Sequence, residues 1–409
     1  MSAIQSQLIQ LIYATTQGAS SSSSSSKKMH RQIFLVLLLF IGPAFADLLQ
    51  NSDFESPPSN LPENSTTPFQ QLSGNSTIPG WSFEGTIVYV TANQTVALPG
   101  NGHAIQLGED GKINQTINPV ADYVHYLLTF TLAPGGQNCS TNANVSVSAP
   151  DSNSILSFKQ NFGKEKWQTY GLYLGSWEQQ EPVNLILESQ STESDAKSTC
   201  WPLIDKLLLK SIETLVPGDD NLLLNGGFEF GPEFLSNSTE GVLLDSAPTP
   251  VLSPLRQWSI SGTVKYIDSK HYFVPEGNAA VEFVSGVSTG IQAATTVEAG
   301  SKYSLDFTLG DANDSCRGNF LVGAQAGSTA QNFTLQSNGT GSAKNFSLAF
   351  KADLTTALIG FVSYTTTQTK DGVFCGPIVD NVVLRASQGM KSKIKWEAFI
   401  FLLFLVGIL

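Results

Sequence analysis

Two kinds of residue in this sequence could support catalysis, a serine in a nucleophile-like motif and the many carboxylates. Gly286-Val-Ser-Thr-Gly290 matches G-x-S-x-G, which in an esterase follows a strand, precedes a helix and needs a positioned histidine and acid. Apolar, strand-like runs flank it on both sides, so we expect a turn between strands. A glycosidase needs two carboxylates about 5 to 9.5 Å apart, and no spacing singles out such a pair. We therefore expect no catalytic residues and no enzyme activity.

Sugar binding needs other residues, namely aromatic faces that stack on pyranose rings and polar groups that fix their orientation. One cluster combines Trp167 and Trp177 with Tyr170 and Tyr173 between them. We take these four residues as the candidate ligand patch, the alternative being ordinary strand residues that pack in a core. Trp81 and Trp258 lie inside apolar runs, and for them we expect core packing.

Composition narrows the classes of protein that remain. The chain has 409 residues, of which 41% are hydrophobic and only 14% charged, with a formal net charge of −12. No Lys/Arg cluster lies in a foldable region, so nucleic acid is not an expected partner. Four His, four Cys and no CxxC motif argue against a zinc ribbon or a CxxC redox protein. A secreted, acidic, all-β protein is the class that fits.

The elements that position these residues occur twice. Asp47-Leu-Leu-Gln-Asn-Ser-Asp-Phe-Glu55 matches Asn221-Leu-Leu-Leu-Asn-Gly-Gly-Phe-Glu229, and Cys200-Trp-Pro-Leu-Ile-Asp205 matches Cys375-Gly-Pro-Ile-Val-Asp380. Short apolar runs separated by turns predict an all-β fold with two tandem jelly-roll-like β-sandwich domains. We place the first domain at residues 47–214, a linker at 215–220 and the second domain at 221–386.

The cysteines follow the duplication, with two in each copy at equivalent places. In a secreted chain this favours two disulfides, since other pairings would cross domains. The expected pairs are Cys139–Cys200 and Cys316–Cys375, and the alternative is free thiols.

Both ends of the chain read as processing signals. Residues 1–46 form an N-terminal extension and a signal peptide, with basic residues before a short apolar run that ends in Ala44-Phe-Ala46. Residues 387–409 combine small residues, a polar spacer and an apolar tail, which predicts a glycosylphosphatidylinositol (GPI) anchor with Ser387 as the modified residue. Such an anchor would hold the protein on the outer leaflet of the plasma membrane. The alternatives are an unusually long basic region at the start and a short buried helix at the end.

N-x-S/T sequons are frequent, and in a secreted chain many of them would carry glycans on exposed loops. They occur at Asn64, Asn75, Asn93, Asn114, Asn138, Asn144, Asn237, Asn313, Asn332, Asn338 and Asn345.

The opening N-L-L-x-N-G-x-F-E, a G-W-S strand and the closing C-x-P-x-x-D resemble the plant cell-wall proteins with tandem "domain of unknown function 642" modules. The resemblance implies two galactose-binding-like β-sandwiches, location in the cell wall or on the cell surface, binding of pectin or cellulose, and pectin methylesterases as protein partners. It implies no catalytic activity. The first copy departs from the pattern at Ser52-Asp53, where the second has Gly226-Gly227.

The same segments also resemble those of bacterial carbohydrate-binding modules, in which a Glu and an Asp help to hold a structural Ca²⁺. By position the counterparts are Glu55 with Asp205, and Glu229 with Asp380. Ca²⁺ prefers six to eight oxygen ligands, which one Glu and one Asp could supply together with backbone carbonyls. The alternative is that these carboxylates accept backbone N–H groups in turns. Beyond this possible structural calcium we expect no cofactor.

We therefore expect a secreted, non-enzymatic protein of the plant cell wall and the extracellular face of the plasma membrane. It would bind wall polysaccharide (pectin, galactan or cellulose), modulate a pectin methylesterase, or do both. Its negative charge disfavours de-esterified pectin, a polyanion, and favours neutral glycans or basic enzymes. The alternatives are a glycan-modifying hydrolase and an adhesion or receptor-like ectodomain with a protein ligand.

Overall fold

The computed structural model describes most of the chain between residues 48 and 387. The described residues are 48–61, 67–93, 98, 102–122, 124–135, 143–179, 181–190, 200–212, 214–216, 220–236 and 238–387. Their regular structure is β-strand apart from one short 3₁₀ helix, η2 (Pro250–Leu252). In this part of the chain no helix is both long enough and apolar enough to cross a membrane. The prediction of an all-β protein with two tandem β-sandwich domains is confirmed.

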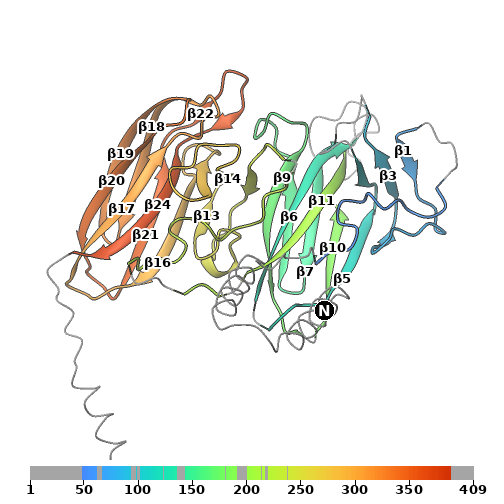
Figure 1. Ribbon diagram of the computed structural model, residues 1–409, viewed down its shortest axis with the longest axis horizontal. Coiled ribbons are helices and arrows are strands. Elements are labelled where there is room, and N and C mark those ends of the chain that lie inside the picture. The colour runs from blue at the N-terminus through green and yellow to red at the C-terminus, as the bar shows by residue number, and fades with distance from the viewer. Residues whose placement is uncertain are drawn as a thin grey trace, which may run out of the picture. The chain divides into compact units, whose positions relative to one another are not determined.

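The first module, blue to green in Figure 1, packs two sheets face to face. Its larger sheet contains, in spatial order, β1 (Phe69–Gln71), β3 (Ile87–Thr91), β4 (His103–Leu107), β11 (Trp201–Ile212), β6 (His125–Gly135) and β9 (Gln168–Ser176). Its five-stranded sheet contains β2 (Ser82–Glu84), β5 (Lys112–Ile117), β10 (Val183–Ser189), β7 (Asn144–Ala149) and β8 (Ser152–Ser157). Alternation in β5, where Ile113 and Ile117 are buried and Thr116 is exposed, turns the apolar side chains toward the core between the sheets.

The second module, yellow to red in Figure 1, repeats this plan. Its larger sheet contains β12 (Val242–Leu244), β14 (Val264–Asp268), β15 (Ala279–Phe283), β24 (Ile378–Ala386), β17 (Lys302–Gly310) and β20 (Ala343–Lys351). Its five-stranded sheet contains β13 (Ser259–Ser261), β16 (Gly290–Thr296), β21 (Thr356–Ser363), β18 (Arg317–Ala326) and β19 (Thr329–Asn338), and a small ribbon pairs β22 (Thr367–Gln368) with β23 (Phe374–Cys375).

Trp81 and Trp258 show how closely the two modules correspond. Both rings are buried, as expected from their apolar neighbours. Each Nε1–H donates to backbone carbonyls of the opening segment, at Gln50 and Asn51 in the first module and at Leu224 and Asn225 in the second. The tryptophan therefore fixes the opening loop to the core, which explains its place in both copies.

The larger sheets of the two modules join into one sheet of twelve strands. The junction is a parallel pair, in which Val242 and Leu243 of β12 lie opposite Thr169 and Tyr170 of β9. Because a parallel pair adds backbone hydrogen bonds to side-chain packing, the modules meet through continuous β-structure.

The predicted disulfide of the second module is confirmed. Cys316 and Cys375 are bonded and close a loop with a sequence separation of 59. Cys200 of the first module is also disulfide-bonded, while its expected partner Cys139 lies outside the described residues.

Replacing Cys316 and Cys375 together by serine should lower the free energy of unfolding by about 4 kcal/mol, because the unfolded chain regains the entropy of an open loop of this length. Chemical denaturation of the variant and the parent protein, both oxidised, measures the difference. Equal midpoints would show that this disulfide adds nothing to stability.

Candidate functional site: a neutral groove on the second module

A groove of about 440 Å³ crosses the outer face of the five-stranded sheet of the second module. It is built from side chains that point away from the core on all five strands. Strand pairing arranges them in two neighbouring rows, Ser259–Gln292–Gly360–Gln325–Ala330 and Ser261–Gly290–Val362–Gly323–Asn332. Pro248 and Tyr364 also line it, as do the residues between the two rows, Ile260, Ile291, Ala324 and Phe361.

Gly360 forms the middle of the groove floor, and its own backbone does not require glycine. A Cβ at this position would meet nothing closer than the Ile291 carbonyl oxygen at 3.6 Å, and the residue's φ lies outside the left-handed region. Glycine weakens a strand interior and often marks a place where another molecule approaches closely. Here the missing side chain leaves the floor open.

Tyr364 supplies an aromatic surface, and Gly323 makes room for it. A Cβ on Gly323 would lie 2.7 Å from the Tyr364 ring, so only glycine lets the ring rest against β18. The ring remains 47% exposed. An exposed aromatic face beside open backbone is suited to stacking on a pyranose ring.

The polar groups of the groove are all uncharged. Gln292, Gln325 and Asn332 present amides, and Ser259 and Ser261 present hydroxyls. Amides and hydroxyls can donate and accept hydrogen bonds, which matches sugar hydroxyl groups. Among the residues that the structure describes, no carboxylate, lysine, arginine or histidine lines the groove, so these residues supply neither the acid–base pair of a glycosidase nor a counter-charge for a polyanion.

The equivalent face of the first module is filled and charged. By strand register, Ile186 is equivalent to Gly360 of the second module, and Asn114 is equivalent to Gln292. In the next row Glu84, Lys112 and Glu188 replace Ser261, Gly290 and Val362, and Lys112 pairs with Glu84 at 3.5 Å. The duplicated modules therefore differ in both the shape and the charge of this face.

The predicted aromatic ligand patch does not fit the structure. Trp167, Tyr170, Tyr173 and Trp177 are all buried, with at most 9% of any residue exposed. Tyr170 lies in the core, and Trp177 stacks on Tyr126 with 4.9 Å between ring centroids. The core-packing alternative therefore describes Trp167, Tyr170 and Trp177, whereas Tyr173, although buried, also contributes to the wall of a hollow beside β9.

The four carboxylates suggested for calcium occupy matching places, with Asp205 and Asp380 at the irregularity of the last strand of each module. In the first module, Glu55 accepts hydrogen bonds from the backbone N–H and the ring Nδ1 of His103, at 2.8 Å each. Asp205 accepts from the Lys206 N–H through Oδ1, whereas its buried Oδ2 accepts no hydrogen bond from any described residue. Burial first, and then the charges of Glu55 and Asp53, raise the pKa of Asp205 to about 8.

In the second module every carboxylate oxygen of the pair accepts an N–H donor. Glu229 binds Asn278 and Ala279, and Asp380 binds the backbone of Glu276 and Asn381. Burial raises the pKa of Asp380 to about 7, with further contributions from Glu229 and Glu276. Among the described residues no group of three or more His, Cys, Asp or Glu is arranged to hold a metal. The two modules thus differ at Asp205 Oδ2, which accepts no hydrogen bond from the described residues, whereas both oxygens of Asp380 do.

The G-x-S-x-G segment lies in a turn, as predicted. It connects β15 to β16, and Ser288 has a φ of 71°. A strand follows the serine where a nucleophile elbow needs a helix, so the motif has no esterase geometry.

The predicted sequons fall into three groups. The asparagines in exposed positions are Asn75, Asn93, Asn313, Asn332, Asn338 and Asn345. Asn114 and Asn144 are half-buried on the five-stranded sheet of the first module. Asn64, Asn138 and Asn237 lie outside the described residues. Asn332 is the sequon that also lines the groove.

Comparison with known proteins identifies the family. The model of the family described as "Protein of unknown function (DUF642)" matches residues 47–210 and 221–385. The chain belongs to this family. Two DUF642-like relatives come from Arabidopsis thaliana. Protein DUF642 L-GALACTONO-1,4-LACTONE-RESPONSIVE GENE 2 is 30% identical, over 85% of this chain and 96% of the relative. Protein TEEBE is 31% identical, over 86% of this chain and 97% of the relative.

Among solved structures, the tandem CBM22-1–CBM22-2 domain of Paenibacillus barcinonensis Xyn10C is similar to this DUF642 chain. It is 14% identical, with 76% of this chain and 94% of that chain covered, at a TM-score of 0.26.

Proposed function

We propose that this DUF642 protein is a non-enzymatic binding protein for neutral cell-wall polysaccharide, and that the groove of the second module is its binding site. The observation that supports this most directly is the uncharged lining around Gly360, with amides and hydroxyls beside an exposed tyrosine. A neutral galactan or cellulose chain needs such hydrogen bonds and stacking contacts. De-esterified pectin would bring negative charge to a protein whose net charge is −12.

The full-length protein, produced in a eukaryotic secretory host, should be retained on neutral galactan or cellulose and not on de-esterified pectin. Because no charged side chain lines the groove, retention should change by less than about twofold between low and high salt. Pull-down at several salt concentrations measures both properties, and the release of reducing ends measures hydrolysis, which we expect to be absent. Salt-sensitive binding to pectin alone, or turnover of any of the glycans, would contradict the proposal.

A pectin methylesterase is a second candidate partner, supported by the acidic charge, because a basic enzyme would be attracted to this surface. This interaction should weaken steeply with salt, in contrast to sugar binding. The two functions can therefore be separated in one salt series.

We further propose secretion, a GPI anchor on the outer leaflet of the plasma membrane, and N-glycosylation at exposed sequons other than Asn332, because a glycan on Asn332 would occupy the groove. The backbone N–H of Ser387 donates to the Lys302 carbonyl at 2.9 Å, immediately after β24 ends. An anchor at Ser387 would thus follow directly on the folded module.

We also propose a structural Ca²⁺ near Asp205. It would compensate the charge of the buried carboxylate, with Glu55 as the second acidic ligand.

A further inference from the structure

A second hollow lies where the two modules meet. Its volume is about 460 Å³. The first module contributes β8 and β9, including Asn153, Ile155 and Tyr173, and the second contributes the segment after β12, including Ser246 and Leu252. Ile155 and Leu252 are 64% and 50% exposed, so the hollow offers apolar surface next to amide and hydroxyl groups and to the carboxylates of Asp151 and Asp245.

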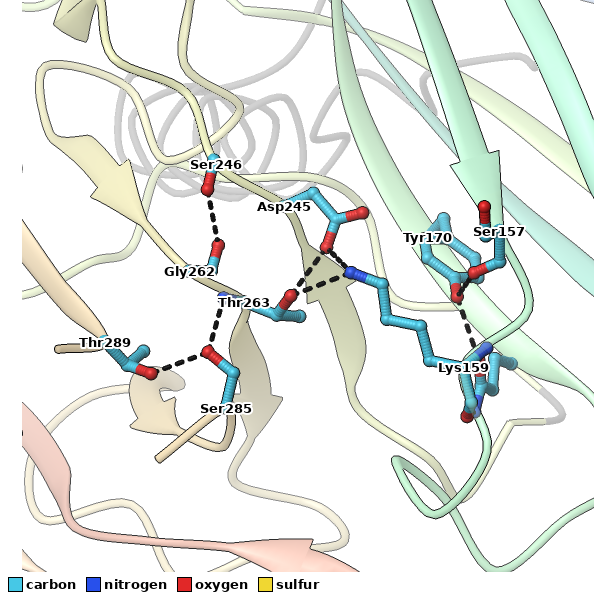
Figure 2. A network of polar contacts seen from close by, with 10 residues as sticks. Ser157, Lys159, Tyr170, Asp245, Ser246, Gly262, Thr263, Ser285 and Thr289 are labelled. Atoms are coloured by element: carbon cyan, nitrogen blue, oxygen red, sulfur yellow. Dashed lines mark hydrogen bonds and ion pairs between the residues drawn. The ribbon is translucent and has the colours of Figure 1, made fainter. Parts of the chain in front are cut away.

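The walls of this hollow are held together by contacts between the modules. Lys159 of the first module forms an ion pair with Asp245 of the second and donates to Thr263 Oγ1 at 2.8 Å. Figure 2 shows Lys159 reaching across to Asp245 and Thr263, while Thr263 binds Asp245 as well. All three residues belong to one hydrogen-bonded group, which ties the segment after β12 to the first module.

A buried arginine adds a second connection. The guanidinium of Arg256 lies 5.3 Å from the centroid of the Tyr173 ring, and its Nη1 donates to the Val251 carbonyl at 2.9 Å. Arg256 therefore links the loop of η2 to β9 on the floor of the hollow. With the parallel β9–β12 pair, these contacts shape the hollow before any ligand arrives, which reduces the ordering cost of binding.

The hollow and the groove are neighbours, because Pro248 lines both of them. The adjoining Ala247 pairs with Ile260 of β13 through both backbone hydrogen bonds. The surface between the groove and the hollow is therefore formed by a segment that is hydrogen-bonded to the edge of β13.

We propose that the inter-module hollow is a second subsite, which receives the part of a linear neutral polysaccharide chain that extends beyond the groove. This inference rests on the proposed function, since it assumes that the groove binds such a chain. The hollow supplies what a continuing chain needs, with Asn153 and Ser246 for hydrogen bonds and Ile155 and Leu252 for the apolar faces of the sugar rings. A polysaccharide chain long enough to reach both the groove and the hollow makes more contacts with the protein than a short one. The affinity of the protein for the polysaccharide therefore rises with chain length.

Titration of the full-length protein with neutral galacto- and cello-oligosaccharides of increasing length tests this. Chains of about ten units should bind at least about tenfold more tightly than chains of about three units. Ile155→Asp should reduce the affinity for long chains to that for short ones and leave the affinity for short ones unchanged. Leu354→Asp is the matched control, because Leu354 is 71% exposed and lines neither hollow; it should behave as the parent protein.

The outcomes separate the two proposals. Equal affinity for short and long chains in the parent protein, or an Ile155→Asp variant that retains the length dependence, would overturn the second subsite alone. Absence of binding to every neutral oligosaccharide would overturn the proposed function itself. Circular dichroism of both variants shows that folding is intact, which is expected because both side chains are exposed.

Discussion

Replacing Gly360 by isoleucine should abolish polysaccharide binding and leave the fold intact. The new side chain would fill the middle of the groove floor, between Gln292 and Gln325, and displace any sugar ring from it. The backbone can accept a Cβ, whose nearest neighbour would lie at 3.6 Å. Isoleucine already stands at the equivalent position of the first module, Ile186. Since isoleucine also favours strands over glycine, stability should be unchanged or higher.

We expect the affinity for a neutral oligosaccharide to fall by at least about tenfold, equal to about 1.4 kcal/mol, in isothermal titration. Ala294→Ile is the matched control, because Ala294 is exposed on the same strand as Gln292 but lies outside the groove. A Gly360→Ile protein that is folded and binds as well as the Ala294→Ile protein would contradict the assignment of the site.

The stability of the protein should fall as the pH rises from about 4 to 8. The folded pKa of Asp205, about 8, lies above its ordinary value of 3.8, and Asp380 follows with a folded pKa of about 7. Over this window the folded chain holds protons that the unfolded chain has released, so raising the pH favours unfolding. The contribution of protonated Asp205 and Asp380 to the free energy of unfolding is complete below about pH 4. It is lost as the pH rises through the folded pKa values. We expect a melting temperature at least about 5 °C higher at pH 5 than at pH 8.

Asp205→Asn should flatten this dependence. The amide keeps the oxygen that accepts the Lys206 N–H and removes the buried charge whose second oxygen has no partner. The variant should therefore gain stability at pH 8 and change little at pH 4, as measured by thermal unfolding. Ca²⁺ should raise the melting temperature of the parent protein at pH 8 and have less effect on the variant. A melting temperature independent of pH would contradict the account of these carboxylates.

The sequence predicts the architecture well, because the signals for it are local and occur twice. The repeated opening and closing segments, the paired cysteines and the alternation of apolar residues each reflect contacts that both modules make. Trp258 is an example, since its apolar neighbours already indicate a buried ring. The G-x-S-x-G turn is predicted for the same reason, since the runs on both of its sides are strand-like.

The sequence does not indicate the candidate groove, because its residues come from five strands that only the fold brings together. The aromatic cluster around Tyr170 is prominent in the sequence, but alternation along β9 does not say which of the two faces is buried, and β9 is covered on both. The groove has few aromatic residues and no motif. The one signal in the sequence is a missing side chain, because Gly360 interrupts an apolar run where the first copy has Ile186. Matching these two positions requires the strand register.

The most direct test of the central claim is a crystal structure of the protein in complex with a neutral galacto- or cello-oligosaccharide. The account predicts sugar rings lying over Gly360, with hydrogen bonds to Gln292 and Gln325 and a ring stacked on Tyr364. An oligosaccharide bound on the five-stranded sheet of the first module, or at the loops around Asp205, with the groove of the second module empty, would contradict it.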